Sequence, residues 1–260
     1  FFLYLPLPAP HTPIVPIPPF KGSSGLNPYA DFVMQMDHHM GQLLASLKEF
    51  GLDKNTLVIF TSDNGCSPEA NFALLQKHGH KPSARYRGHK ADIYEGGHRV
   101  PFIARWPGKI KPDSTSAQTI CLTDLMATAA ALTGAELPNN AAEDSYDLSP
   151  VLLGDQGKEA VRQYTLHQTI SLALAIRRGP WKYLDHKGSG GNNYNRDGRW
   201  GMKQYALPEQ APTAPGQLYN LKTDPGETTN LYFKHPKIVK TMKAKLEQFK
   251  KSGRSAPMRR

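Results

Sequence analysis

The 260-residue chain has few of the features that mark disulfide-rich or membrane proteins. It has two cysteines, Cys66 and Cys121, which are too few for a disulfide framework. We expect both thiols to be unpaired, and a single bridge between them is the alternative. No apolar run approaches the length of a membrane span, since Phe1–Leu7 is short and is interrupted by Pro6. The sequence therefore predicts a soluble globular chain with no membrane partner.

The sequence also lacks a signal peptide and does not begin with methionine. At 260 residues it is still long enough to bury a sizeable core in one large or two small domains. We therefore expect a fragment or a processed form of a longer protein.

Acidic residues are in the minority, and the formal net charge of +10 is concentrated in the second half, especially Lys234–Arg260. A basic excess can attract polyanions such as nucleic acid or sulfated polysaccharide. Ile238, Met242, Leu246 and Phe249 nevertheless recur at helical spacing, which predicts an amphipathic helix whose lysines face water. We expect no nucleic-acid partner, and a polyanion-binding module remains an alternative.

The first part of the chain, residues 1–155, alternates strand-like and helix-like segments. Leu26–Phe50 has apolar residues at i, i+3 and i+4 spacing and predicts a helix that stops at Gly51. Thr56–Thr61 and Val100–Trp106 predict buried strands, and Thr123–Leu132 predicts a second helix. This alternation predicts an α/β fold with a partial, mostly parallel sheet flanked by helices.

The second part, residues 156–260, has a different pattern. Ser171–Arg178, Trp181–His186 and Gln217–Leu221 predict short antiparallel strands, and a terminal helix is expected at about 236–251. Residues 187–216 are rich in Gly, Asn, Pro and Gln without periodicity, which is typical of a functional or disordered loop. We predict a small C-terminal antiparallel sheet with a terminal helix as a separate subdomain.

Two oxygen-bearing side chains follow the first buried strand. Asp63 and Asn64 come directly after Thr56–Ser62, at the carboxyl end where open α/β sheets bind ligands. A carboxylate beside a carboxamide suits a hard divalent cation such as calcium. A simple turn is the alternative, because Asp, Asn and Gly all favour turns.

Four blocks resemble motifs of the sulfatase family in the alkaline phosphatase superfamily. Two of these are the segment that ends in Thr61-Ser-Asp-Asn-Gly65 and the Gly88–Pro101 segment GHKADIYEGGHRVP. Upstream, Ala9-Pro-His-Thr-Pro13 follows the strand-like Phe1–Leu5, and downstream lies the block Gln217–Leu231. The blocks occur in the family's order and span nearly all of the chain.

The resemblance implies an alkaline-phosphatase-like fold and a sulfuric ester hydrolase. It implies that Asp63 and Asn64 hold calcium, and that Lys90 contacts both the sulfate and the leaving-group oxygen. His11 is implied to bind the sulfate and to protonate the departing oxygen, a task suited to a side chain that titrates near neutrality. Glu95 is expected to orient the local backbone or Arg99 rather than to do chemistry.

The nucleophile of the family is not found in this sequence. Sulfatases make a formylglycine from Cys or Ser in C/S-x-P-x-R, in a part of the protein that precedes all four blocks. Cys66-Ser-Pro-Glu-Ala70 lacks the arginine, and Ser255-Ala-Pro-Met-Arg259 lies in a basic tail. We therefore expect the formylglycine and further metal ligands in a missing N-terminal part, and we expect the isolated chain to be inactive.

The resemblance further implies a sulfated small molecule or sulfated glycan as substrate, and a periplasmic or secreted parent protein. A phosphatase or phosphotransferase on the same scaffold is the alternative enzyme. Those enzymes usually place two metals with extra His and Asp ligands, whereas the Asp63–Asn64 pair and the segment around Lys90 favour sulfate.

Overall fold

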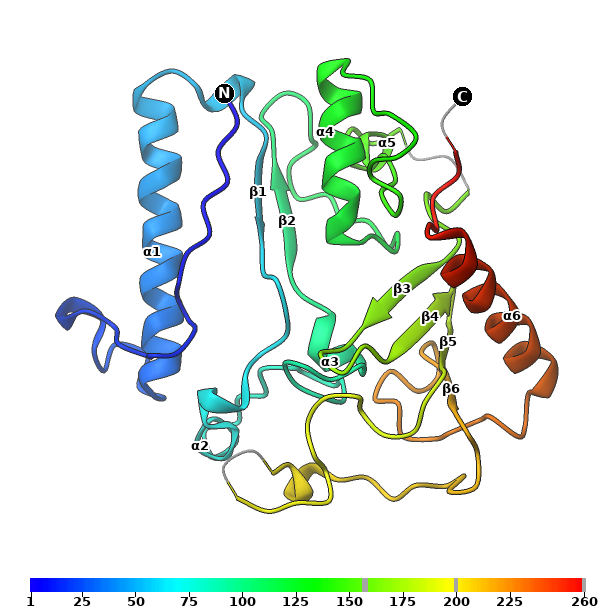
Figure 1. Ribbon diagram of the computed structural model, residues 1–260. Coiled ribbons are helices and arrows are strands. Elements are labelled where there is room, and N and C mark those ends of the chain that lie inside the picture. Colours follow the sequence, from blue (N-terminus) through cyan, green and yellow to red (C-terminus); the bar gives the residue numbers. More distant parts are fainter. Residues whose placement is uncertain (156–158, 199–200, 259–260) are drawn as a thin grey trace.

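The structure is a computed structural model that describes residues 1–155, 159–198 and 201–258. It contains a two-stranded and a four-stranded sheet (Figure 1). The strands are β1 (Val58–Thr61), β2 (Phe102–Arg105), β3 (Thr165–Gln168), β4 (Leu174–Arg178), β5 (Trp181–Leu184) and β6 (Gln217–Asn220). The α-helices are α1 (Pro28–Glu49), α2 (Phe72–Lys77), α3 (Glu95–His98), α4 (Leu125–Thr133), α5 (Ser149–Leu152) and α6 (Pro236–Ser252). Short 3-10 helices span Pro18–Phe20, Asp53–Asn55, Pro68–Ala70, Leu122–Asp124 and Lys203–Tyr205.

Strands β1 and β2 pair antiparallel, so the predicted parallel arrangement is wrong for this pair. Their register pairs Thr61 with Phe102, so the chain leaves β1 and re-enters β2 at the same end. Residues 62–101 therefore form one long excursion, and the short α2 and α3 do not form a crossover helix. The strand–helix–strand pattern did not predict the antiparallel pairing. Two strands become parallel only when the connection between them runs the length of the sheet, and the short helices here do not.

The structure also differs from the predictions for Phe1–Leu5, which was expected to be strand-like, and for β2, which was expected to be buried. Phe1–Leu5 forms no strand in the described structure, and its side chains are exposed, with Phe2 at 88%. Ile103 of β2 is 60% exposed. A β-branched or aromatic sequence becomes a buried strand only where a neighbouring strand and a covering layer exist, and here the described residues supply neither for Phe1–Leu5.

The two predicted helices of the first part are confirmed. The side chain of Asn27 caps α1 by accepting a hydrogen bond from the Ala30 N–H at 3.0 Å. Gly51 and Gly134 follow α1 and α4 in the left-handed conformation, with φ of 68° and 73°. Figure 1 shows α1 beside the N-terminal segment on one side of the β1–β2 pair, and α4 on the other. No described helix combines the length and the apolar character that a bilayer crossing requires.

The C-terminal sheet and its terminal helix are confirmed as well. The strand order is β3-β4-β5-β6 and all neighbours are antiparallel, with β3 an edge strand that the sequence did not predict. Helix α6 covers one face of this sheet (Figure 1). Their shared core consists of buried residues from the sheet and the helix: Ile176, Tyr183, Leu218, Val239, Met242, Leu246 and Phe249.

The other face of the sheet packs against the excursion between β1 and β2. Ile93 and Tyr94, each 1% exposed, cluster with sheet residues such as Leu184 and Tyr219. The sheet face opposite α6 therefore supports the segment that carries Lys90. The division at residue 155 stays a prediction, although this core cluster takes residues from both sides of it.

Candidate functional site

The predicted metal ligands lie on the excursion directly after β1. Asp63 is exposed and Asn64 is half-buried. No other described residue forms a hydrogen bond or ion pair with either side chain. The Ser62 hydroxyl donates to the Asn64 carbonyl oxygen at 3.1 Å and so holds the backbone of this turn. The Asp63 carboxylate and the Asn64 amide thus have no partner among the described residues, and metal binding by them stays a prediction.

Backbone contacts bring the second sequence block against the first. The Lys90 N–H donates to the Cys66 carbonyl oxygen at 3.0 Å, and the Gly65 N–H donates to the Gly97 carbonyl oxygen at 2.8 Å. A Cβ on Gly65 would lie 1.9 Å from the Gly96 carbonyl oxygen, so this position needs glycine. Lys90 is half-buried, and in the described part of the chain nothing pairs with its ammonium group.

His11 lies on the exposed N-terminal segment, between two cis prolines, Pro10 and Pro13. Its Nδ1 is 2.8 Å from the Thr12 carbonyl oxygen and 3.4 Å from the Thr12 hydroxyl, so both contacts of the ring stay within the N-terminal segment. No contact among the described residues joins His11 to Asp63, Asn64 or Lys90. The shared anion pocket of these four side chains therefore stays a prediction.

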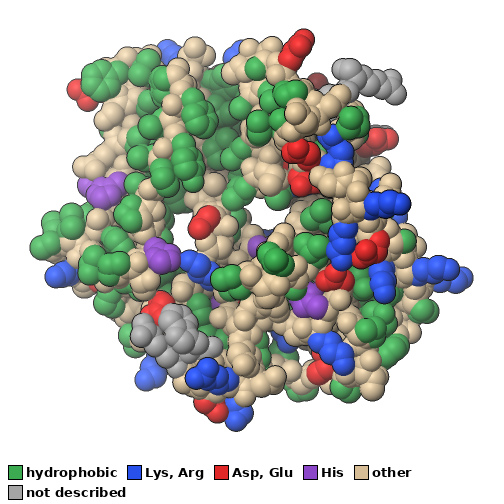
Figure 2. Space-filling view, viewed as in Figure 1, with side chains coloured by type: hydrophobic (Ala, Val, Ile, Leu, Met, Phe, Trp, Pro, Cys, Tyr) green, Lys and Arg blue, Asp and Glu red, His purple; other side chains and the backbone are tan. Residues whose placement is uncertain are grey.

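Figure 2 shows that this face of the molecule is hollowed near its centre. Separate acidic and histidine side chains border the hollow among hydrophobic and other surface.

Beneath the Gly96–Gly97 backbone lies a buried ion network that the sequence did not predict. Lys182, with no exposed side-chain surface, places its ammonium 3.1 Å from Glu95 and 2.9 Å from Glu227. The Glu95 N–H donates to Glu227 at 2.6 Å, and Arg99 contacts Glu95 at 3.3 Å. Arg99 is thus one partner of Glu95, and the expected role of Glu95 outside the chemistry stays a prediction. The only sequence signal for Lys182 was its place in a short strand, where lysine normally faces water.

The network perturbs its acidic members in opposite directions. Burial opposes the ionisation of Glu95, but the positive charges of Lys182 and its neighbours outweigh burial and lower the pKa from 4.5 to about 2. Burial dominates at Glu227 and raises its pKa. One ammonium therefore keeps Glu95 firmly ionised and balances Glu227 less completely.

Glu95, His98 and His167 bring ligand atoms within 4.8 Å of one another, as a metal site would. The Lys182 ammonium, however, already lies 3.1 Å from both Glu95 and the His98 Nε2. Burial and the charge of Lys182 lower the pKa of His98 to about 3, and burial lowers the pKa of His167. We conclude that Lys182 is the cation of this cluster and that a second one would be repelled.

The two sequence look-alikes of the nucleophile have structural roles. Burial raises the pKa of the Cys66 thiol to about 11, so it is protonated and unreactive at neutral pH. The Ser255 hydroxyl donates to Asp144 at 2.5 Å and its N–H donates to the same oxygen at 2.8 Å, which anchors the C-terminal tail. Arg259, which would complete that pattern, lies outside the described residues. Cys66 and Cys121 are unpaired, as expected.

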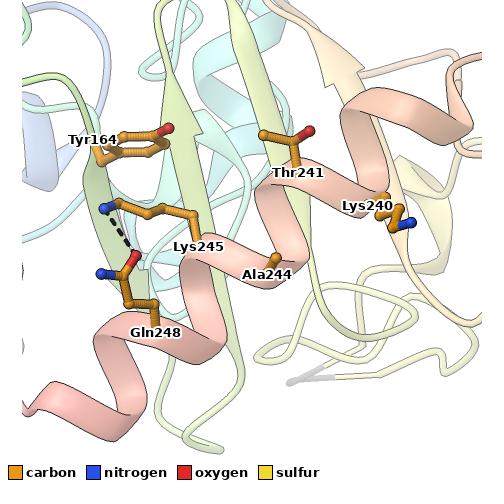
Figure 3. Close-up of a pocket in the computed structure, with 6 residues that line it drawn as sticks. All are labelled: Tyr164, Lys240, Thr241, Ala244, Lys245 and Gln248. Atoms are coloured by element: carbon orange, nitrogen blue, oxygen red, sulfur yellow. Dashed lines mark hydrogen bonds between the residues drawn. The ribbon is translucent and has the colours of Figure 1, made fainter.

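A depression of about 430 Å³ lies on the surface of α6, in the basic half of the chain for which polyanion binding is the alternative (Figure 3). The Lys245 ammonium lies 5.4 Å from the centre of the Tyr164 ring and donates to Gln248 at 3.1 Å. No carboxylate, histidine or cysteine side chain lines it. The depression is a helix surface with a satisfied lysine and offers no hydrolytic chemistry.

Comparisons with known proteins agree with the motifs. The family model described as Sulfatase matches residues 1–135. The chain is 37% identical over 253 residues to an N-acetylgalactosamine-6-O-sulfatase of Bacteroides thetaiotaomicron, covering 96% of the chain and 47% of that protein. It is 36% identical over 236 residues to human arylsulfatase A, covering 89% of the chain and 44% of that enzyme.

Solved structures agree too. A structure reported for the metabolism of multiple glycosaminoglycans by Bacteroides thetaiotaomicron superposes with a TM-score of 0.83 at 36% identity, covering 96% of the chain and 50% of that protein. The chain therefore spans about half the length of the relatives that it matches.

Proposed function

The chain belongs to the sulfatase family, and we propose that the complete protein hydrolyses a sulfate ester to an alcohol or phenol plus sulfate. The observation that carries this proposal is the hydrogen bond of 3.0 Å from the Lys90 N–H to the Cys66 carbonyl oxygen. This hydrogen bond joins the Gly88–Pro101 segment to the chain directly after the turn that carries Asp63 and Asn64. In the complete protein we propose that the β1–β2 pair joins a larger, mostly parallel alkaline-phosphatase-like sheet.

The charges of this site suit a sulfate ester. Lys90 would bind a sulfate oxygen and the leaving-group oxygen, and so stabilise charge that develops as the ester bond breaks. His11 would deliver a proton to the departing oxygen. Asp63 and Asn64 fit part of a calcium site, because both offer unpartnered oxygens, and bound calcium would polarise the sulfate group.

The attacking group is proposed to be a formylglycine in the part of the protein that this chain does not cover. Neither cysteine can replace it, because the Cys66 thiol has a raised pKa and Cys121 is not part of a C-x-P-x-R pattern. The 260-residue chain by itself is therefore expected to bind calcium weakly and to show no turnover.

The proposed substrate class is a sulfated glycan, with N-acetylgalactosamine 6-sulfate as the first compound to test. The relative from Bacteroides thetaiotaomicron carries that specificity in its name and matches 96% of the chain. A periplasmic or secreted location for the complete protein is part of the same proposal.

The decisive experiment compares sulfate release from N-acetylgalactosamine 6-sulfate and from 4-nitrophenyl sulfate with phosphate release from 4-nitrophenyl phosphate. We expect the complete protein to prefer a sulfate ester, and Lys90→Ala and Asp63→Ala to reduce kcat/KM by about 100-fold or more. Lys203→Ala, an exposed lysine paired with Asp197, is the matched control and should keep full activity. Faster turnover of the phosphate ester would refute the sulfatase proposal in favour of the phosphatase alternative.

A further inference from the structure

Asp92 is a buried carboxylate two residues after Lys90, with 4% of its surface exposed. Its Oδ2 accepts hydrogen bonds from the His89 N–H at 2.8 Å and from the Tyr194 hydroxyl at 2.6 Å. Its Oδ1 accepts from the Asn192 N–H at 2.9 Å. Hydrogen bonds to a carboxylate are among the stronger ones in proteins. Asp92 therefore ties the turn at residues 88–92 to the segment at residues 189–194.

The tyrosine contributes as a donor. Burial raises the pKa of the Tyr194 hydroxyl, and the nearby Asp92 carboxylate raises it further. The phenol therefore stays protonated throughout the physiological pH range and donates a hydrogen bond to the carboxylate.

Both backbone groups of Lys90 are held as well, one by Cys66 and the other by the segment at residues 189–194. Its N–H donates to the Cys66 carbonyl oxygen at 3.0 Å, and its carbonyl oxygen accepts from the Asn192 side chain at 2.8 Å. The two backbone segments around Ala91 and Gly191 are in close contact, since a Cβ on Gly191 would lie 2.1 Å from the Ala91 carbonyl oxygen. The Lys90 side chain thus extends from a fixed backbone while its ammonium has no partner among the described residues.

We propose that Asp92 is a positioning residue for Lys90, and that residues 189–194 are the other half of this clamp. The inference rests on the proposed function, in which Lys90 meets the sulfate. An ammonium that must contact two oxygens as the ester bond breaks gains from a fixed origin, because a misplacement of about 1 Å can cost roughly 100-fold in rate. Asp92 itself would touch neither substrate nor metal.

The test is Asp92→Asn in the complete protein, with Tyr194→Phe as a milder variant. An amide presents N–H groups where one carboxylate oxygen accepted hydrogen bonds, so the clamp loosens. We expect kcat for 4-nitrophenyl sulfate to fall by about 10- to 100-fold, and by less for Tyr194→Phe. Asp31→Asn is the matched control, because Asp31 is also 4% exposed and also accepts three hydrogen bonds, from Gly22 and Ser24. It should leave kcat within about twofold, since Asp31 lies in the first turn of helix α1 and contacts neither Lys90 nor residues 189–194.

A second background separates positioning from general loss of structure. In Lys90→Ala, adding Asp92→Asn should cause no further loss of turnover, or of inorganic sulfate binding where turnover is too slow to measure. An equal loss in both backgrounds, or no loss in either, would overturn the proposal.

Amide hydrogen exchange gives a readout that does not need activity. Asp92→Asn should accelerate exchange of the His89 and Lys90 N–H groups at least tenfold relative to Asp31→Asn, while helix α6 stays protected. If the wild-type protein hydrolyses no sulfate ester, the proposed function fails and exchange alone decides the clamp. Unchanged exchange at residues 89 and 90 would then refute it.

Discussion

Lys182 shows how one residue can hold two parts of a chain together. It comes from β5, has no exposed side-chain surface, and reaches Glu95 of α3 at 3.1 Å and Glu227 at 2.9 Å. Two carboxylates around one ammonium leave an excess negative charge, which Arg99 and Arg177 offset at 3.3 and 3.5 Å. Removing the central cation leaves carboxylates that are still desolvated, and this costs more than the pair contributed.

Lys182→Met should therefore destabilise the protein by about 3–5 kcal/mol, measured as the free energy of unfolding in urea. Lys203→Met is the control, since that lysine pairs with Asp197 while its side chain is 60% exposed, and it should cost about 0–1 kcal/mol. A loss below about 1 kcal/mol for Lys182→Met would contradict the network described here.

His98 gives the network a pH dependence. Burial and the positive charge of Lys182 lower its pKa from 6.5 to about 3, with Arg177 acting in the same direction and Glu95 against it. The unfolded chain takes up a proton below about pH 6.5 while the folded ring stays neutral, so stability should fall as the pH drops from 6.5 toward 3. Glu95, whose pKa is lowered from 4.5 to about 2, adds to the loss below pH 4.5.

Urea unfolding at several pH values between 7 and 5 measures how steeply the free energy of unfolding falls with pH. In this range Glu95 does not yet contribute to the slope. His98→Gln should reduce it, and His167, whose pKa burial also lowers, should keep part of it. His78→Gln is the control, because His78 is exposed. An unchanged slope in His98→Gln would show that His98 is already protonated in the folded state.

At the scale of elements, glycines set how closely the turn after β1 approaches the Gly88–Pro101 segment. A Cβ on Gly65 would lie 1.9 Å from the Gly96 carbonyl oxygen, which is a backbone atom that cannot rotate away. Gly65→Ala should therefore lower both stability and any calcium affinity of the complete protein, measured by urea unfolding and by calorimetry. Gly41→Ala is the control, because nothing lies within 4 Å of that helical position, and it should stabilise by about 0.5–1 kcal/mol. Equal effects of the two changes would mean that the close approach is absent.

Elements with local signals were predictable from the sequence. Helices α1 and α6 have continuous apolar stripes and glycine stops, and β4 and β5 flank the Gly179–Pro180 turn. The direction of β2 was not predictable, because it depends on how residues 62–101 return to the start of the sheet. Strand β3 was missed, since its four residues carry no turn or alternation signal strong enough to be read alone.

The candidate site shows the same limit. Motif order selected Asp63, Asn64 and Lys90 as candidates, and the structure joins the Lys90 backbone to Cys66, two residues after Asn64. Asp92 was not selected although it lies within the Gly88–Pro101 block, and Lys182 lies in no block, because their hydrogen-bond partners Asn192 and Glu95 are about 100 and 87 residues away. Residues with long-range partners of this kind can be found only once the chain is folded.

At the scale of the whole molecule, the net charge of +10 raises the question of whether basic residues gather substrate. Several lysines of α6 are already engaged: Lys250 contacts Asp185 at 2.8 Å and Glu247 at 2.9 Å, and Lys245 lies 4.6 Å from the centre of the Phe249 ring. The helix face should therefore attract sulfated polymers only through weak and salt-sensitive forces.

Replacing Lys243, Lys245 and Lys250 together by glutamine tests this view. We expect earlier elution from a heparin column, because the long-range attraction is reduced, and kcat/KM for a monosulfated sugar within about twofold of wild type. Asp63→Ala should do the reverse, abolishing turnover while leaving heparin elution unchanged, since one exposed carboxylate hardly alters the field of α6. A large loss of turnover in the lysine variant would instead make α6 part of the substrate site, and the polyanion-binding alternative would then describe this protein better than a solvated helix.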